Sequence, residues 1–174
     1  MNKPTPIDEE ILLDPKRYIV SETDEKGKIT FCNDYFMEVS GYSKEELIGK
    51  AHNIVRHPDM PKIVFKLLWE TISSGKNINA LVKNMAKDGR YYWIFTEFEI
   101  RKDTDTGKII GYHAARKSIS KHVIEVIADL YKELLEIEKK DSIEASQTYL
   151  INFLKEKGDD MEFANIMEEI HRFY

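Results

Sequence analysis

The side chains best suited to chemistry gather in one short segment, HNIVRHPDMP, at residues 52–61. Arg56 offers a planar guanidinium fork that matches the oxygens of a phosphate. It lies just before an expected helix start, where free N–H groups and the positive end of the helix dipole favour an anion. His57 could donate a hydrogen bond or stack on a ligand, and Asp59 could bond a ribose hydroxyl. These residue types predict binding of a phosphate-bearing ligand.

Each of these residues also has a purely structural interpretation. Arg56 could pair with Asp59 at the surface, His57 with Pro58 could only shape the turn, and Asp59 could cap the next helix. His52 and His57 stand five residues apart with no other ligands nearby, so a metal site is not expected. No nucleophile motif or triad context is present, so we do not expect an enzyme.

Strand and helix signals alternate in a distinctive order along the chain. Apolar and β-branched runs bounded by Gly and Asp turns predict strands at 18–23, 28–32, 78–85, 91–101 and 108–117. Between the second and third strands, Asn33 caps a short helix that Gly41 ends, and Ser43 with Glu46 forms a capping box for another. A longer helix, with Asp59 as its N-cap, carries an apolar stripe and ends at Gly75.

After residue 117 the hydrophobic period becomes helical and the chain becomes acidic. About three helices are expected in residues 118–174, the last starting at Asp159 or Asp160. Their apolar stripes either pack on the rest of the chain or form a docking face for a partner or an oligomer. The chain thus divides into an arm at 1–16, a mixed domain at 17–117 and a helical region at 118–174.

The composition of the 174 residues excludes several classes of protein. The single cysteine rules out an internal disulfide framework, and a net charge of −5 without a basic block makes nucleic acid a poor partner. No apolar run is long enough to span a bilayer, and the first residues lack the features of a signal peptide. We therefore expect a cytoplasmic protein.

The element order resembles that of a PAS domain over residues 17–117. The resemblance rests on four segments, which read NDYF, SGYSKEELIG, KDGRYYW and IIGY. It implies an α/β (α+β) fold, with a five-stranded antiparallel sheet, short helices on one face and a C-terminal helical segment.

The HNIVRHPDMP segment is similar to the signature of the aerotaxis-receptor type of PAS domain, which binds FAD. Val82-Lys83-Asn84 before the Lys-Asp-Gly turn fits the same subfamily. The length and helical tail resemble the stand-alone PAS half of a bipartite energy-taxis system. The resemblance implies non-covalent FAD, redox sensing and relay to a membrane-bound methyl-accepting chemotaxis transducer through its HAMP region, with a homodimer as a further option.

Asn53 and Asn84 match flavin-contacting positions of the related LOV photoreceptors, and an amide can both donate to and accept from the flavin edge. Either residue could instead serve only its own turn or strand end. Ile54 replaces the reactive LOV cysteine, so no photoadduct is expected. His113 matches a LOV glutamine and could sense flavin protonation, or could simply face a neighbour or solvent.

Alternation along the fourth strand separates two faces. We expect the face bearing Tyr92, Ile94, Thr96 and Phe98 to contact the cofactor. The other face, with Trp93, would be a dimer surface or would carry the C-terminal helix. Two alternatives stay open for the whole chain, a haem-binding gas sensor with a histidine ligand and an interaction module without a cofactor.

Overall fold

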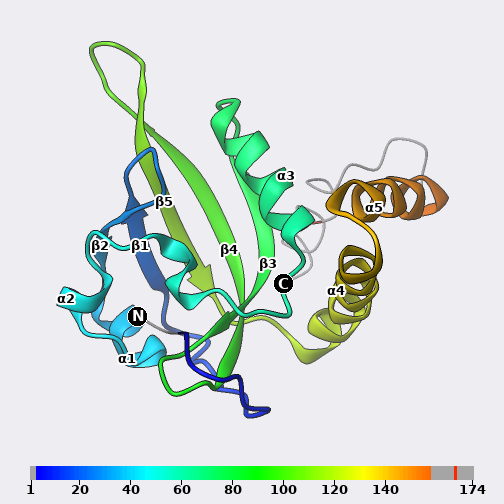
Figure 1. Ribbon diagram of the computed structural model, residues 1–174. Helices are drawn as coiled ribbons and strands as arrows, with labels where there is room; N and C mark the ends of the chain where they lie inside the picture. The colour runs from blue at the N-terminus through cyan, green and yellow to red at the C-terminus, as the bar shows by residue number, and fades with distance from the viewer. Residues whose placement is uncertain (1–2, 158–166, 168–174) are drawn as a thin grey trace.

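The protein, described here by a computed structural model over residues 3–157 and Met167, is built on one antiparallel sheet of five strands (Figure 1). The strand order is β2-β1-β5-β4-β3. The strands are β1 (Ile19–Thr23), β2 (Ile29–Cys32), β3 (Ile78–Met85), β4 (Tyr91–Lys102) and β5 (Ile109–Lys117). These bounds confirm the predicted strands and their hairpins to within a residue at most ends, because Gly and Asp turns separate them.

Three short helical segments and one longer helix connect β2 to β3 and cover one face of the sheet. They are α1 (Asp34–Ser40), α2 (Lys44–Leu47), the 3₁₀ segment η1 (His52–Val55) and α3 (Lys62–Ser73). Asn33 accepts a hydrogen bond from the Phe36 N–H, and Gly41 ends α1 in the left-handed conformation. The predicted capping box of Ser43 and Glu46 is also present.

The start of α3 differs from the prediction. Pro61, which has no N–H, stands at the cap position, and no side chain of its own segment caps the helix. Asp59 is therefore not the N-cap, because its carboxylate lies 3.1 Å from the Lys83 ammonium on β3 instead. A carboxylate from a distant helix takes its place, as described below.

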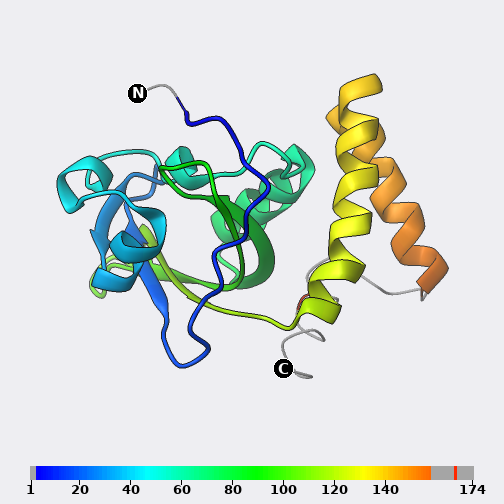
Figure 2. The same ribbon diagram turned by 90° about the horizontal axis from the view of Figure 1, so that it is seen from below.

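Two helices follow the sheet, α4 (Lys121–Lys140) and α5 (Ile143–Lys157). They lie side by side on one flank of the sheet domain (Figure 2). The Tyr131 hydroxyl of α4 donates to the Leu81 carbonyl at 2.8 Å, and the Tyr131 ring lies 6.3 Å from the Trp93 ring. The face of β4 that carries Trp93 thus receives α4, one of the two options predicted for it. Apart from Met167, the third helix expected in the tail lies outside the described residues.

The N-terminal arm runs along the β3–β4 turn. Backbone hydrogen bonds hold it there: the Ile7 N–H donates to the Gly89 carbonyl, and the Ile11 N–H donates to the Tyr91 carbonyl. Gly89 has φ +97°, and an added Cβ would meet the Thr5 carbonyl oxygen at 2.3 Å, so this position requires glycine. Within the described residues, no helix combines the length and apolar character needed to cross a bilayer.

Candidate functional site

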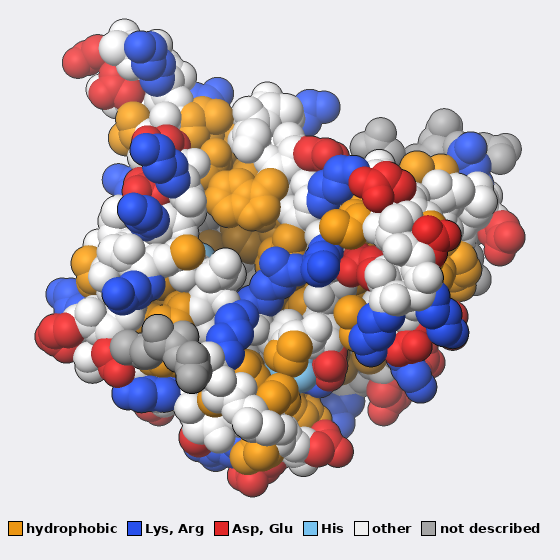
Figure 3. Space-filling model, viewed as in Figure 1, with side chains coloured by type: hydrophobic (Ala, Val, Ile, Leu, Met, Phe, Trp, Pro, Cys, Tyr) orange, Lys and Arg blue, Asp and Glu red, His pale blue; other side chains and the backbone are white. Residues whose placement is uncertain are grey.

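A cavity of about 350 Å³ lies between the inner face of the sheet and the segments η1 and α3. Sites that hold small molecules and cofactors have volumes of roughly 300–1,000 Å³. In the space-filling view, hydrophobic side chains lie deep in a hollow beside α3, and Lys and Arg side chains run along its edge (Figure 3). The lining residues come from β1, η1, α3 and the three long strands, which explains why no single sequence segment describes the cavity.

The lining of this cavity combines aromatic and cationic side chains. Its aromatic residues are Phe65, Trp69, Phe98 and Tyr112, and its cationic residues are Lys26, Arg56 and Arg116. Among the described residues that line it, none is Asp or Glu. A flat ligand that carries negative charge fits such a wall.

Arg116 of β5 is the most unusual group of the site. Its side chain is only 3% exposed, and it donates to Ser21 Oγ at 2.9 Å, to the Ala114 carbonyl at 3.2 Å and to His52 Nε2 at 2.9 Å. All three of these acceptors are neutral. Burial lowers the pKa of Arg116 to about 10, so the guanidinium is still protonated at neutral pH. A buried cation without a carboxylate among its hydrogen-bond partners is costly unless a ligand supplies negative charge.

His52 of η1 is held neutral beside Arg116. Burial and the positive charge of Arg116 lower the pKa of His52 to about 3. Because Nε2 accepts from Arg116, the ring proton is on Nδ1. The imidazole stacks on the Phe36 ring with centroids 5.6 Å apart, and Ser21 Oγ lies 3.1 Å from Nε2. This arrangement fixes both the tautomer and the orientation of the ring.

Thr96 of β4 adds an unsatisfied polar group to the cavity wall. Its hydroxyl is buried, lines the cavity and has no hydrogen-bond partner among the described residues. Buried hydroxyls are normally hydrogen-bonded, so an orphaned one on a cavity wall fits contact with a ligand. Thr96 and Arg116 together show that the residues present suit a polar, anionic ligand.

Four of the eight predicted site residues line the cavity. Asn53 and Arg56 approach from η1 and its end, and Asn84 and Ile94 lie on β3 and β4. The Arg56 guanidinium stacks over the Phe65 ring of α3 at 3.9 Å. An isolated backbone bridge between Arg56 and Asn84 joins the η1 end to β3, so the structure brings these two residues together.

His57 and Asp59 lie outside the cavity lining. His57 is buried, its Nδ1 accepts from the Asp59 N–H at 3.1 Å, and its ring contacts the Tyr91 ring edge-on at 6.1 Å. Burial and nearby Lys83 lower the pKa of His57 to about 4. Both residues therefore shape the turn between η1 and α3 in this structure.

Tyr92 and His113 also lie outside the lining, for different reasons. Tyr92 is buried on the predicted face of β4, and Ile94, Thr96 and Phe98 of that face do line the cavity. His113 lies on the opposite face of the sheet, with Nδ1 3.8 Å from a Glu22 carboxylate oxygen. Alternation on β5 explains this, since the cavity residues are Tyr112, Ala114 and Arg116.

Sequence reasoning missed Arg116, His52 and Trp69 as cavity residues. Strict alternation along β5 places Arg116 on the cavity face, whereas the match of His113 to a LOV glutamine favours the opposite face. Trp69 closes the cavity from α3, with its ring edge-on to Tyr112 at 5.6 Å. No signal in the α3 stripe distinguishes this tryptophan from the core residues around it.

Comparisons with known proteins agree with this geometry. A profile for the PAS fold matches residues 29–115. The aerotaxis receptor of Escherichia coli K12 is 41% identical over 118 residues, which are 67% of this chain and 22% of the receptor. A blue-light photoreceptor of Listeria monocytogenes is 28% identical over 70% of this chain and 47% of its own length. This chain therefore spans only a part of these relatives.

A solved Light-Oxygen-Voltage domain, studied with a flavin analogue, superposes with a TM-score of 0.56. The match covers 64% of this chain and 83% of that one at 16% identity, so it supports the fold. The profile, the strand order and the 41% identity together make the assignment. The chain belongs to the PAS family, and its PAS domain is of the aerotaxis-receptor type.

Proposed function

We propose that this protein is a redox sensor that binds a flavin, FAD, in the cavity between the sheet and α3. The observation that carries the proposal is the buried Arg116 in a cavity without acidic lining residues among those described. Such a cation is costly without a negative or strongly polar partner, and the polar edge of a flavin ring, which gains negative charge on reduction, would provide one. The similarity to an aerotaxis receptor supports the same proposal.

The lining residues divide into three sets that match the parts of FAD. Ile94, Leu68 and Val82 form an apolar slot for a flat ring. Asn84, Asn53 and Thr96 supply hydrogen-bonding groups for its polar edge. Arg56 and Lys26 supply positive charge for a diphosphate. His57, Asp59, Tyr92 and His113 contribute indirectly in this proposal, by holding the segments that carry these sets.

A bound flavin supplies reversible electron uptake, which changes the charge and protonation of its ring. Arg116 keeps its charge at neutral pH, and His52 stays neutral with its proton on Nδ1. Arg116 would therefore hold a reduced, more negative ring more strongly, in competition with its own contacts to Ser21 and His52. Because those two contacts join β1 and η1 to β5, we infer that their rearrangement begins the signal.

We further propose that the output goes to another protein and that the chain is not an enzyme. The partner would be a membrane-bound methyl-accepting chemotaxis transducer, contacted at its HAMP region, as in a bipartite energy-taxis system. The protein would then act in the cytoplasm and reach the inner membrane only through that transducer. A second copy of the chain is the alternative partner for the same surfaces.

An absorption spectrum of the purified full chain, followed by mass spectrometry of any released chromophore, tests the proposal. We expect a flavin spectrum and FAD as the released compound. A Soret band without flavin would select the haem sensor, and a colourless protein that takes up no added FAD would select the interaction module. For the partner, co-purification with the transducer's HAMP region should depend on whether the bound flavin is oxidised or reduced.

Two variants test the residue assignment within that experiment. Arg56→Ala and Asn84→Ala should each lower FAD occupancy, because one removes a cation and the other an amide from the cavity wall. Lys108→Ala, a change in the β4–β5 turn, is the matched control and should retain full occupancy. Full occupancy in both cavity variants would contradict the site even if the protein binds FAD.

A further inference from the structure

The N-terminus of α3 is capped by a residue far along the chain. The N–H groups of Lys62 and Ile63 donate to the two carboxylate oxygens of Glu138, at 2.9 and 2.8 Å. Glu138 lies in the last turn of α4. The first N–H groups of a helix are free and carry the positive end of its dipole, which is why a carboxylate binds there.

The same corner of the molecule carries Arg56. Its guanidinium stacks on Phe65, in the first turn of α3. Burial lowers the pKa of Arg56, and the negative charge of Glu138 acts in the opposite direction. Arg56 and Glu138 thus contact the same first turn of α3, and Arg56 is the cation that the proposed function assigns to a ligand phosphate.

We propose that Glu138 competes with the phosphates of the bound ligand for the positive field of Arg56 and the α3 N-terminus, so that ligand binding weakens the attachment of α4 to α3. This inference rests on the proposed function, because it takes the ligand to be a phosphate-bearing flavin. Coupling of this kind is reciprocal, so release of Glu138 should also strengthen phosphate binding. Glu138 would thus set both the preference for phosphate and the response of the tail.

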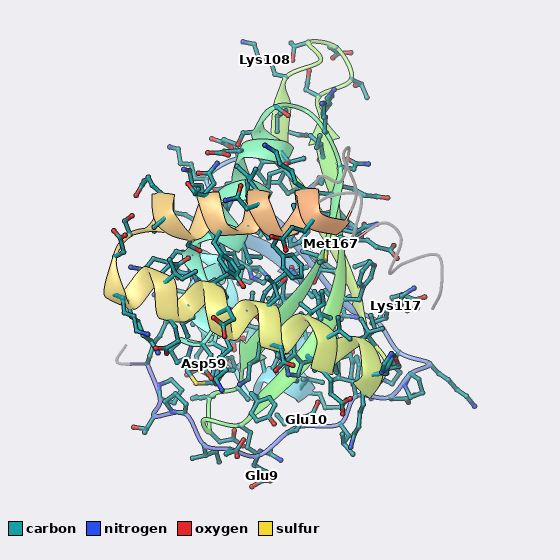
Figure 4. All side chains as sticks on the ribbon, turned by 90° about the vertical axis from the view of Figure 1, so that its right-hand side faces the viewer. Glu9, Glu10, Asp59, Lys108, Lys117 and Met167 are labelled. Atoms are coloured by element: carbon teal, nitrogen blue, oxygen red, sulfur yellow. The ribbon has the colours of Figure 1, made fainter. Side chains whose placement is uncertain are left out.

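The rest of the contact surface determines which part of the tail responds. Tyr131, in the middle of α4, is held on β3 by its hydroxyl, and Leu134 is fully buried. Lys66, one turn along α3 from the Glu138 contact, donates to Gln147 of α5 at 2.8 Å. In Figure 4, α4 starts near Lys117 and passes the labelled Asp59, a residue that precedes α3 in the sequence. The chain then reverses direction into α5. We expect the end of α4 and the start of α5 to move while the middle of α4 stays in place.

The test compares Glu138→Gln with Glu136→Gln in the full chain. Both changes remove one negative charge from the same turn of α4, but Glu136 is exposed and bonds only Lys139 among the contacts described. Dissociation constants are measured for FAD and for riboflavin, which has no phosphate. We expect Glu138→Gln to bind FAD 3- to 10-fold more tightly than wild type and riboflavin equally well. Glu136→Gln should match wild type for both.

Hydrogen exchange in the wild-type protein gives a second readout. FAD should speed exchange at the Lys62 and Ile63 amides and in the last turn of α4, and riboflavin should not. Equal FAD affinity in Glu138→Gln and wild type, or FAD binding that leaves these amides unchanged, overturns this proposal and leaves the proposed function intact. Failure of every variant to bind either flavin overturns the proposed function and this proposal together.

Discussion

The two faces of the long strands use similar polar groups in opposite ways. On the outer face, Tyr131 of α4 buries its hydroxyl and bonds the Leu81 carbonyl. On the inner face, Thr96 buries a hydroxyl without any partner among the described residues, and Arg116 buries a cation among neutral acceptors. Buried polar groups stabilise a fold only when they are paired. The outer face therefore contributes to stability, and we propose that the inner face keeps its polar groups for a ligand.

The largest effect on stability should come from removing the contact of α4 with the outer face of the sheet. Tyr131→Ala removes a fully buried ring and its hydrogen bond, and should lower the free energy of unfolding by about 3–5 kcal/mol. Tyr131→Phe, which keeps the ring, should cost about 1 kcal/mol. Denaturant unfolding measures both. FAD affinity should stay within about twofold of wild type for Tyr131→Phe, and a larger loss would show that the faces are not independent.

Arg116→Ala should show the reverse pattern. Removal of the buried cation should weaken FAD binding at least about tenfold, which is about 1.4 kcal/mol, while the ligand-free protein keeps or gains stability. Titration with FAD and thermal unfolding measure the two quantities. The control is Arg101→Ala, which removes a half-buried arginine that is paired with Glu22 outside the cavity lining. Unchanged FAD affinity in Arg116→Ala would remove the basis of the proposed function.

The strand pattern, the caps of the first helices and the face of β4 that carries the cavity could be predicted from sequence because local rules determine them. Asn33, Gly41 and Ser43 act through residues within one turn of themselves. The cap of α3 could not be predicted in this way, since Glu138 reaches it across 75 residues of chain. The pairing of Arg116 with His52 likewise joins β5 to η1, which only the folded chain brings together.

Acidification should weaken the folded state through His52. Its pKa is about 3 in the folded protein and about 6.5 when unfolded, so the unfolded chain binds the proton first as the pH falls below 6.5. Stability is therefore lost with falling pH in this window. His52→Gln should reduce the loss between pH 7 and 5 by about 1–2 kcal/mol, measured by urea unfolding at both values. An identical loss in wild type and variant would show that His52 titrates normally.

Thr96→Val is the mildest of the changes and tests a single hydroxyl of the inner face. The substitution keeps the shape and removes a hydroxyl that has no partner, so the ligand-free protein should be unchanged or stabilised by up to about 1 kcal/mol. FAD affinity should fall a few-fold, about 0.5–1 kcal/mol, if the hydroxyl bonds the ligand. Loss of stability with no change in affinity would assign Thr96 to the fold alone.

Two adjacent alanines on β5 allow the most direct test of the central claim, that a flavin binds on the inner face of the sheet. Ala114 lines the cavity, whereas Ala115 lies on the opposite face. In the full chain with ¹³C-labelled alanine methyl groups, addition of one equivalent of FAD should shift the Ala114 methyl resonance strongly through the ring current of the flavin and leave that of Ala115 almost unchanged. A shift at Ala115 without one at Ala114, or no shift at either under saturating FAD, would contradict the account.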